Sequence, residues 1–169
     1  MLHISSLLKN SVLTATVCFA AASAMAQSTE KPTDPQIADI AYTAGQIDVT
    51  AANLALEKTK NRAVRSFAED MARDHEAVNK QVLALLDKLK VEPEDNDTSK
   101  SLVDAASKKQ AELLQLSGAA FDKAYVENEV AYHQNVSEAL EKTLIPDAQN
   151  SQLKDIAVTS FMENLPLRG

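Results

Sequence analysis

The chain has 169 residues and a formal net charge of -7, with only three glycines, one cysteine and no tryptophan. A chain of this length is typical of a single domain. Strand-rich folds need many tight turns, so the scarcity of glycine argues against them and favours an all-α domain. Because nucleic acids and anionic membranes are bound through clustered Lys and Arg side chains, an acidic chain without basic clusters argues against both as partners.

The first 26 residues have the features of a cleavable signal peptide. MLHISSLLKN carries Lys9 and no acid, an uncharged apolar run follows, and AMA precedes Gln27. We therefore expect cleavage after Ala26 and a periplasmic location; a retained N-terminal anchor is the alternative. The only cysteine, Cys18, lies in this leader, so we expect no disulfide in residues 27–169. We also expect no membrane-spanning segment after cleavage.

The first predicted helix follows a short mobile arm, residues 27–33. Thr33 or Asp34 is expected to cap its N-terminus, and it ends near Thr59. Apolar residues recur in it at spacings of three and four, as on one buried helix face: Ile37, Ile40, Ala44, Ile47, Ala51 and Leu54. Gly45 inside this helix costs about 1 kcal/mol relative to alanine. Either a close approach of another helix requires it, or it is a tolerated defect.

The second predicted helix, from about Asn61 to about Lys90, has the most regular buried face. Its inward residues follow one another in steps of three and four: Val64, Phe67, Met71, His75, Val78, Val82, Leu85 and Leu89. This spacing is close to the 3.5-residue repeat of a left-handed helix bundle. The segment VEPEDNDTS that follows contains a proline and four acids, which indicates a solvated loop.

The third predicted helix is shorter and covers about residues 100–117. Thr98 or Ser99 is expected to cap its N-terminus, since both side chains carry a hydroxyl acceptor. Gly118 is expected to end it, because glycine is common directly after a helix.

Two further helices complete the predicted fold. The fourth covers about residues 120–143 and is stopped by Pro146. Its inward face is predicted to carry Asp122, Val126, Glu129, His133, Val136 and Leu140. The fifth covers about residues 148–164. Its inward face is predicted to carry Leu153, Ile156, Ala157, Phe161 and Leu165.

Short loops between long amphipathic helices predict an up-down four-helix bundle in residues 34–169. The first, second, fourth and fifth helices form it, and the third is an extra shorter helix at its side or end. At 1.5 Å per residue, the second helix spans about 45 Å and the fifth only about 25 Å. One end of the bundle is therefore expected to be open. The third helix, a protein partner or a second copy in a homodimer would cover it.

Polar residues interrupt the buried faces of three predicted helices. His75 and His133 each occupy an inward position, and Glu129 lies one turn before His133 on the same face. Asp48 lies on the inner side of the first helix, and Asp122 on that of the fourth. Because a buried carboxylate without a partner is costly, we expect these five side chains to converge.

Three interpretations of this convergence stay open. The residues form a paired structural network that fixes helix register, or the histidines lie at the bundle surface. In the third interpretation Asp48, His75, Glu129 and His133 bind a single Fe, Mn or Zn ion. Di-iron bundles use Glu-x-x-His, and neither histidine is preceded by glutamate at that spacing.

Two stretches carry a family resemblance: GQIDVTAANLALEKTKNRAVRSFAEDMARDHEAVNKQV (residues 45–82) and FDKAYVENEVAYHQNV (residues 121–136). They resemble a family of ferritin-like bacterial proteins that is grouped as a domain of unknown function and is often labelled as outer-membrane proteins. The resemblance implies a secreted four-helix bundle. It places the family's acidic position of the first helix on Asp48 and its histidines on His75 and His133. The family generally has a further histidine after LP in the last helix, where this chain ends in NLPLRG.

The expected function is that of a non-enzymatic periplasmic protein with a binding role in the cell envelope or under stress. The alternative is a transition-metal-binding, ferritin-like protein that sequesters or oxidises its metal. A hydrolase is not expected, since the sequence has neither a GxSxG motif nor a phosphate-binding loop.

Overall fold

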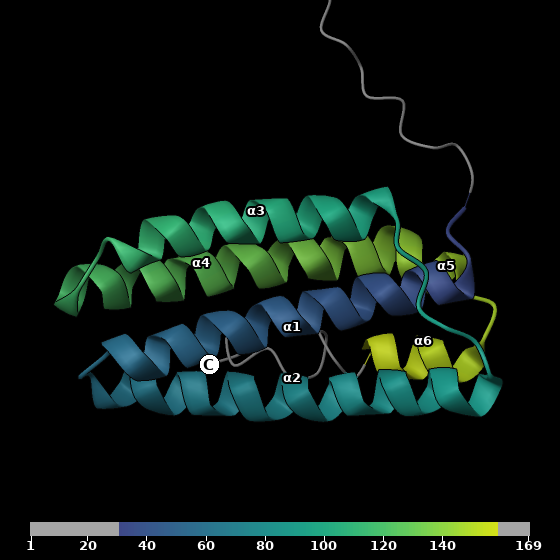
Figure 1. Ribbon diagram of the computed structural model, residues 1–169, viewed down its shortest axis with the longest axis horizontal. Helices are drawn as coiled ribbons and strands as arrows, with labels where there is room; N and C mark the ends of the chain where they lie inside the picture. Colours follow the sequence, from purple (N-terminus) through teal and green to yellow (C-terminus); the bar gives the residue numbers. More distant parts are fainter. Residues whose placement is uncertain (1–30, 159–169) are drawn as a thin grey trace, which may run out of the picture.

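The computed structural model describes residues 31–158, and these fold as an all-α bundle without strands (Figure 1). The expected signal peptide, most of the arm, and the predicted inward residues Phe161 and Leu165 lie outside the described residues. Residues 159–164, the C-terminal part of the predicted fifth helix, also lie outside them, so the open bundle end stays a prediction. The elements are α1 (Asp34–Lys58), α2 (Arg62–Leu89), α3 (Asp97–Leu114), α4 (Gly118–Ala139), the π-helical turn η1 (Leu140–Leu144), α5 (Ile145–Asp147) and α6 (Ser151–Val158).

Helix α1 is the central element. It packs most extensively against α2 and also contacts α3, α4 and α6. Figure 1 shows α3 and α4 running side by side above the pair formed by α1 and α2, with the short α6 beside the C-terminal half of α2. None of the helices in residues 31–158 combines the length and the hydropathy that a membrane span requires.

Side-chain caps set the first helix boundaries. The Thr33 hydroxyl accepts from the Gln36 amide, and the Gln36 side chain accepts in return from the Thr33 amide, which confirms Thr33 as the N-cap of α1. Asn61 caps α2 in the same role: its side-chain oxygen accepts from the Ala63 amide at 2.9 Å. Both boundaries were predicted to within one residue, because capping chemistry is local to the sequence.

The predicted boundaries of the third helix were wrong. The cap is Asn96, whose side-chain oxygen accepts from the Ser99 amide at 3.0 Å, so α3 begins at Asp97 rather than near residue 100. The helix ends at Leu114, before the predicted residue 117. Gly118, with φ of 56°, opens α4 instead of closing α3.

Pro146 does not stop the fourth helix as predicted. The chain continues from α4 through the wider π-helical turn η1 into α5, and ends only at Asp147. Pro146 lies in the first turn of α5, where a missing amide proton costs least. A π turn adds one residue to the helix ladder, which allows the helix to pass the proline.

Two hydrophobic cores fill the bundle. The first core is built from α1, α2, the C-terminal part of α4 with η1, and α6; the second is built from α1, α2, the N-terminal part of α4, and Leu113 of α3. Helix α3 buries only Ser99 and Leu113 fully. It therefore flanks the bundle at its side, one of the two positions predicted for it.

The rotation of α1 differs from the prediction. Ile47 and Ala51 are only partly buried, whereas Asp48 is 1% exposed and Ala52 is fully buried. In α2, Leu89 was predicted to lie inward but is exposed. Both deviations follow from the angle at which the helices dock, which helical periodicity alone does not determine.

Gly45 marks a close contact between α1 and α2. A Cβ atom at this position would lie 2.3 Å from the Oδ1 atom of Asn79. The close approach of another helix is therefore the correct explanation for this glycine. It brings α1 and α2 together one turn before Asp48 and one turn after His75.

Candidate metal centre

A layer of polar side chains separates the two hydrophobic cores. Asp48 comes from α1, His75 from α2, and Glu129 and His133 from α4. Each lies on its helix between residues of the first core and residues of the second. All four side chains are buried, with relative exposures of 1% for the first three and 3% for His133. The surface alternative for the histidines is therefore wrong.

The imidazole rings of the two histidines and the Asp48 carboxylate meet at one point. The Nε2 atoms of His75 and His133 lie 3.3 Å apart. Oδ2 of Asp48 lies 3.4 Å from Nε2 of His75 and 4.0 Å from Nε2 of His133. Taken together, one ligand atom from each residue lies within 4.8 Å of the other two.

These separations match those around a bound ion. With ligand bonds of about 2.1 Å, two ligands of a tetrahedral ion lie about 3.4 Å from each other. The three distances of 3.3, 3.4 and 4.0 Å lie close to this value. An ion between these atoms would therefore need only small side-chain adjustments.

The second ring nitrogen of His133 is held by the backbone of its own helix. Nδ1 lies 3.0 Å from the carbonyl oxygen of Glu129, one turn earlier. Because a carbonyl oxygen can only accept, Nδ1 carries the proton in this bond and donates it. The lone pair of a neutral His133 then lies on Nε2, the atom that faces His75 and Asp48. Metal-binding histidines commonly donate their other ring nitrogen in this way.

The two carboxyl groups are less well satisfied. Neither oxygen of Asp48 accepts a hydrogen bond from an imidazole, amide or hydroxyl group, although Oδ2 lies within ion-pair distance of His75. The carboxyl groups of Asp48 and Glu129 interact with each other. Oε1 of Glu129 accepts from Nδ2 of Asn128 at 3.3 Å, whereas Oε2 forms no hydrogen bond. Buried polar atoms without such bonds are rare and costly, so these oxygens need a further explanation.

Burial dominates the electrostatics of this layer. It raises the pKa of Asp48 well above the usual range for aspartate, and the adjacent charge of Glu129 raises it further. It raises the pKa of Glu129 to about 7. It lowers the pKa of His75 to about 4, with a smaller contribution from the proximity of His133, and it also lowers the pKa of His133. Both imidazoles are therefore neutral near pH 7, which is the form that binds metals.

Residues 19–162 match the family described as a domain of unknown function, DUF4142. The chain belongs to the DUF4142 family. This confirms the grouping that the sequence resemblance implied. No curated protein and no solved structure matches the chain. Because the family has no known function, the chemistry of this DUF4142 domain is inferred from the geometry of its buried side chains.

The DUF4142 domain brings together three of the predicted site residues in one group, Asp48, His75 and His133. Glu129 lies close enough to Asp48 to raise the pKa of Asp48, but it lies outside the group of three. Asp122, the further candidate, is only partly buried and also lies outside it among the described residues.

Two buried polar residues of the DUF4142 domain were not among the predicted site residues. The side-chain amide of Asn79 and the hydroxyl of Tyr125 are buried and form no hydrogen bonds. Asn79 follows His75 by one turn, and Tyr125 precedes Glu129 by one turn, so each shares a helix face with a site residue. The four-residue spacing from the candidate ligands is the signal that would have found them.

Proposed function

We propose that this protein binds one divalent transition-metal ion through Asp48, His75 and His133, and that it sequesters the ion in the periplasm. One observation carries the proposal: three buried ligands from three helices converge within 4.8 Å, and no imidazole, amide or hydroxyl group donates a hydrogen bond to the carboxyl group among them. Two imidazoles and one carboxylate are a ligand set used by Fe and Zn, and also suited to Mn.

A metal explains this layer better than a purely structural network does. In a structural network the carboxylates would accept hydrogen bonds from the imidazoles and fix the helix register. Here no imidazole, amide or hydroxyl group donates to Asp48 or to Oε2 of Glu129, and the two carboxyl groups interact with each other instead. A divalent cation would favour the ionised form of these carboxyl groups and would lower the cost of burying their charge.

The ligand set supports binding of a single ion and not a di-iron centre. A di-iron bundle places glutamate three residues before each histidine ligand. Those positions hold Ala72 and Val130, so the ligands of a second ion are missing from α2 and α4. Sequestration of one ion is therefore favoured over the oxidase activity of di-iron ferritin-like proteins. With three protein ligands, the ion keeps a coordination position for Glu129 or for a small exogenous ligand.

The proposed periplasmic location rests on the leader in residues 1–26. The proposed metal sequestration agrees with the binding role in the cell envelope that the sequence led us to expect, and it names a metal ion as the ligand. A protein in that compartment meets metal ions as they enter the cell, and a buried site with three ligands would keep them from unwanted reactions.

The test is the metal content of the protein after expression without chelators. We expect about one ion per chain in the wild type by mass spectrometry. His75→Ala, His133→Ala and Asp48→Asn should each lose it, because two ligands seldom hold a divalent ion. Glu76→Gln, at an exposed position directly after His75, is the matched control and should retain it. A wild type that neither contains metal nor gains stability from added Fe²⁺, Mn²⁺ or Zn²⁺ would rule the proposal out.

A further inference from the structure

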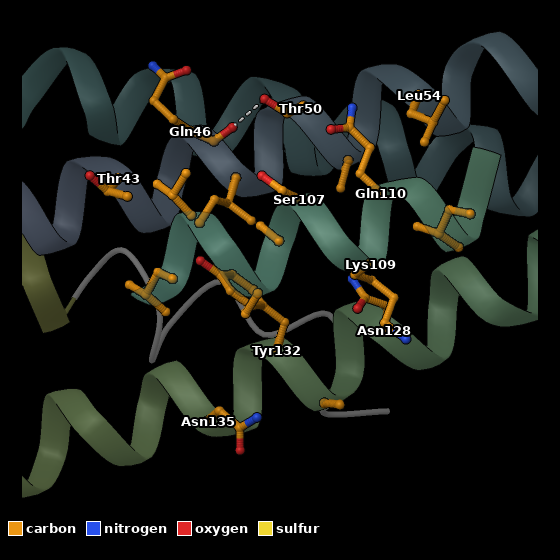
Figure 2. A pocket seen from close by; sticks show the side chains of 18 of the residues that line it. Thr43, Gln46, Thr50, Leu54, Ser107, Lys109, Gln110, Asn128, Tyr132 and Asn135 are labelled. Carbon is orange, nitrogen blue, oxygen red and sulfur yellow. Dashed lines mark hydrogen bonds between the residues drawn. The ribbon is translucent and has the colours of Figure 1, made fainter. Parts of the chain in front are cut away.

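A groove of about 570 Å³ runs between α1, α3 and α4 (Figure 2). Sites for small molecules usually have volumes of about 300–1,000 Å³, so the groove is large enough for one. Its lining is mostly apolar, with Ile47 and Leu54 on α1 and Leu102 and Val103 on α3. Among the described residues, Lys109 is the one charged residue that lines it. The groove therefore suits a molecule with an apolar body and a single negative charge.

Several polar side chains along the groove are already hydrogen-bonded within the protein. The Tyr132 hydroxyl donates to the carbonyl oxygen of Ala44 at 3.1 Å. The Thr50 hydroxyl donates to the carbonyl oxygen of Gln46 at 2.8 Å, the dashed line in Figure 2, and Nε2 of Gln46 donates to the Tyr42 hydroxyl at 3.2 Å. A guest therefore meets mainly the rings of the two tyrosines and the methyl group of Thr50, which adds to the apolar character of the groove.

Helix α3 forms the outer wall of the groove and is held loosely by the bundle. It buries only Ser99 and Leu113 fully, and Val103, which lines the groove, is 48% exposed. It also contacts α1 more than it contacts α4. An alkyl chain placed between α3 and α4 would bury apolar surface of both helices, and the removal of such surface from water is favourable. The groove thus favours an apolar guest even without any contribution from charge.

The dimensions of the groove favour an unbranched chain of medium length. Lys109 follows Leu102 by seven residues on α3, which is about 10 Å along the helix. One lipid acyl chain spans half of the hydrocarbon core of a bilayer, about 15 Å. A chain somewhat shorter than that of a membrane lipid therefore reaches from Lys109 to the Leu102 end of the groove.

Lys109 can bind a carboxylate at the edge of the groove. Its ammonium group lies 2.6 Å from Oε2 of Glu112, and the two side chains are 45% and 65% exposed. Such exposed ion pairs are weak, and an ammonium group has three donors. A ligand carboxylate can therefore bind Lys109 beside Glu112 or in its place.

We infer that the groove between α1, α3 and α4 binds a medium-chain fatty acid, with its alkyl chain along the apolar walls and its carboxylate at Lys109. The single negative charge of this ligand matches the single cation of the lining. The site lies outside the candidate metal centre, because neither Asp48 nor the two histidine ligands line the groove. The inference goes beyond the proposed metal binding and does not depend on it.

The test is isothermal titration calorimetry with decanoate, and with decanol as the uncharged chain of the same length, in the presence of a chelator. Ala106→Trp and Ala131→Trp each fill the groove, the first from α3 and the second from α4. Ser101→Trp is the matched control, because it places the same ring at an exposed position of α3 that does not line the groove. Lys109→Gln removes the cation. Circular dichroism checks that each variant is folded.

We expect about one decanoate per chain in the wild type and in Ser101→Trp, as for a single pocket. Both groove-filling variants should bind it at least about tenfold more weakly, because the indole ring takes the volume of the alkyl chain. Lys109→Gln should lower the affinity for decanoate by about three- to fivefold, as for an exposed ion pair. It should leave the affinity for decanol unchanged.

Absence of decanoate binding in the wild type, or equal affinity in the wild type and the groove-filling variants, would overturn the inference. An equal loss for decanoate and decanol in Lys109→Gln would overturn the position of the carboxylate. A dimeric wild type that Ala106→Trp converts to monomers, at unchanged affinity for decanoate, would assign the groove to a second copy of the chain instead. His75→Ala should lose the metal and still bind decanoate as the wild type does, so the two proposals fail separately.

Discussion

The Nε2 atoms of His75 and His133 lie 3.3 Å apart, although the two residues are 58 positions apart in the sequence. Both imidazoles are neutral near pH 7, because burial lowers the pKa of each. At most one of two facing nitrogens can carry the proton of a hydrogen bond between them. A metal ion would use the lone pairs of both nitrogens, and Asp48 would bind it as a carboxylate after losing its proton.

Metal binding should stabilise the folded chain, because the ligands come from three helices that separate on unfolding. With free Zn²⁺ or Mn²⁺ at about 100 times its dissociation constant, the free energy of unfolding should rise by about 2.7 kcal/mol. Urea titration with and without the metal measures this increase. His133→Ala should show none of it. An equal increase in the wild type and in this variant would place the stabilising ion elsewhere on the protein.

Asp48→Asn should separate metal binding from stability. The substitution keeps the shape of the side chain and removes the buried carboxyl group, to which no imidazole, amide or hydroxyl group donates a hydrogen bond. In the metal-free state at pH 8 we expect the variant to be more stable than the wild type by on the order of 1 kcal/mol, as is common where function strains a site. Its metal affinity should fall at the same time. A variant that is less stable without metal would show that Asp48 has a structural role.

The stability of the metal-free protein should fall as pH rises from about 6.5 to 8. Burial raises the pKa of Glu129 to about 7 in the folded state, so the folded chain holds a proton that the unfolded chain has already lost. The stability that this proton gives is lost as pH rises through the folded pKa. The raised pKa of Asp48 lowers stability with rising pH in the same way. The lowered pKa values of His75 and His133 act in the opposite direction, but only below the unfolded value of about 6.5. Tyr125, whose pKa is raised further above its usual value, does not titrate here.

This pH dependence can be measured by urea unfolding in the presence of a chelator at pH 6.5, 7 and 8. Glu129→Gln should weaken it, because the amide has no proton to lose. A metal-free wild type whose stability is constant or increases over this range would contradict the assigned direction.

Gly45→Ala should destabilise the protein by about 1–3 kcal/mol, the usual cost of overpacking, although alanine is the better helix former. The added Cβ would lie 2.3 Å from Oδ1 of Asn79. Asn79→Ala in the same chain should recover most of the loss, because it removes the clashing atoms. Thermal unfolding of the two single variants and the double variant gives the interaction free energy between residues 45 and 79. Additive effects would mean that the two residues do not limit the approach of α1 and α2.

Much of the fold could be predicted because its signals are local. Periodicity placed Asp48, His75, Glu129 and His133 on inward helix faces. Thr33 acted as a predicted cap, and the second helix began near Asn61 as predicted. The boundaries of α3 and the continuation of α4 past Pro146 were predicted wrongly. Around α3 and around Pro146, several neighbouring residues are able to start or end a helix, and the packing of the bundle selected one of them.

The amino-acid sequence by itself determined most of the side chains that share the inward face of each helix, because the 3.6-residue period holds within a helix whatever surrounds it. Only the tertiary structure decided how the helices rotate and slide against one another. The contact of Gly45 with Asn79 sets the approach of α1 to α2, and the docking angle buries Asp48 almost completely while it leaves Ile47 only partly buried. The distances between ligands on different helices depend on those relative positions, and a metal site requires them to be correct to within about an ångström. The candidate metal centre is therefore a property of the packed bundle and not of any single helix.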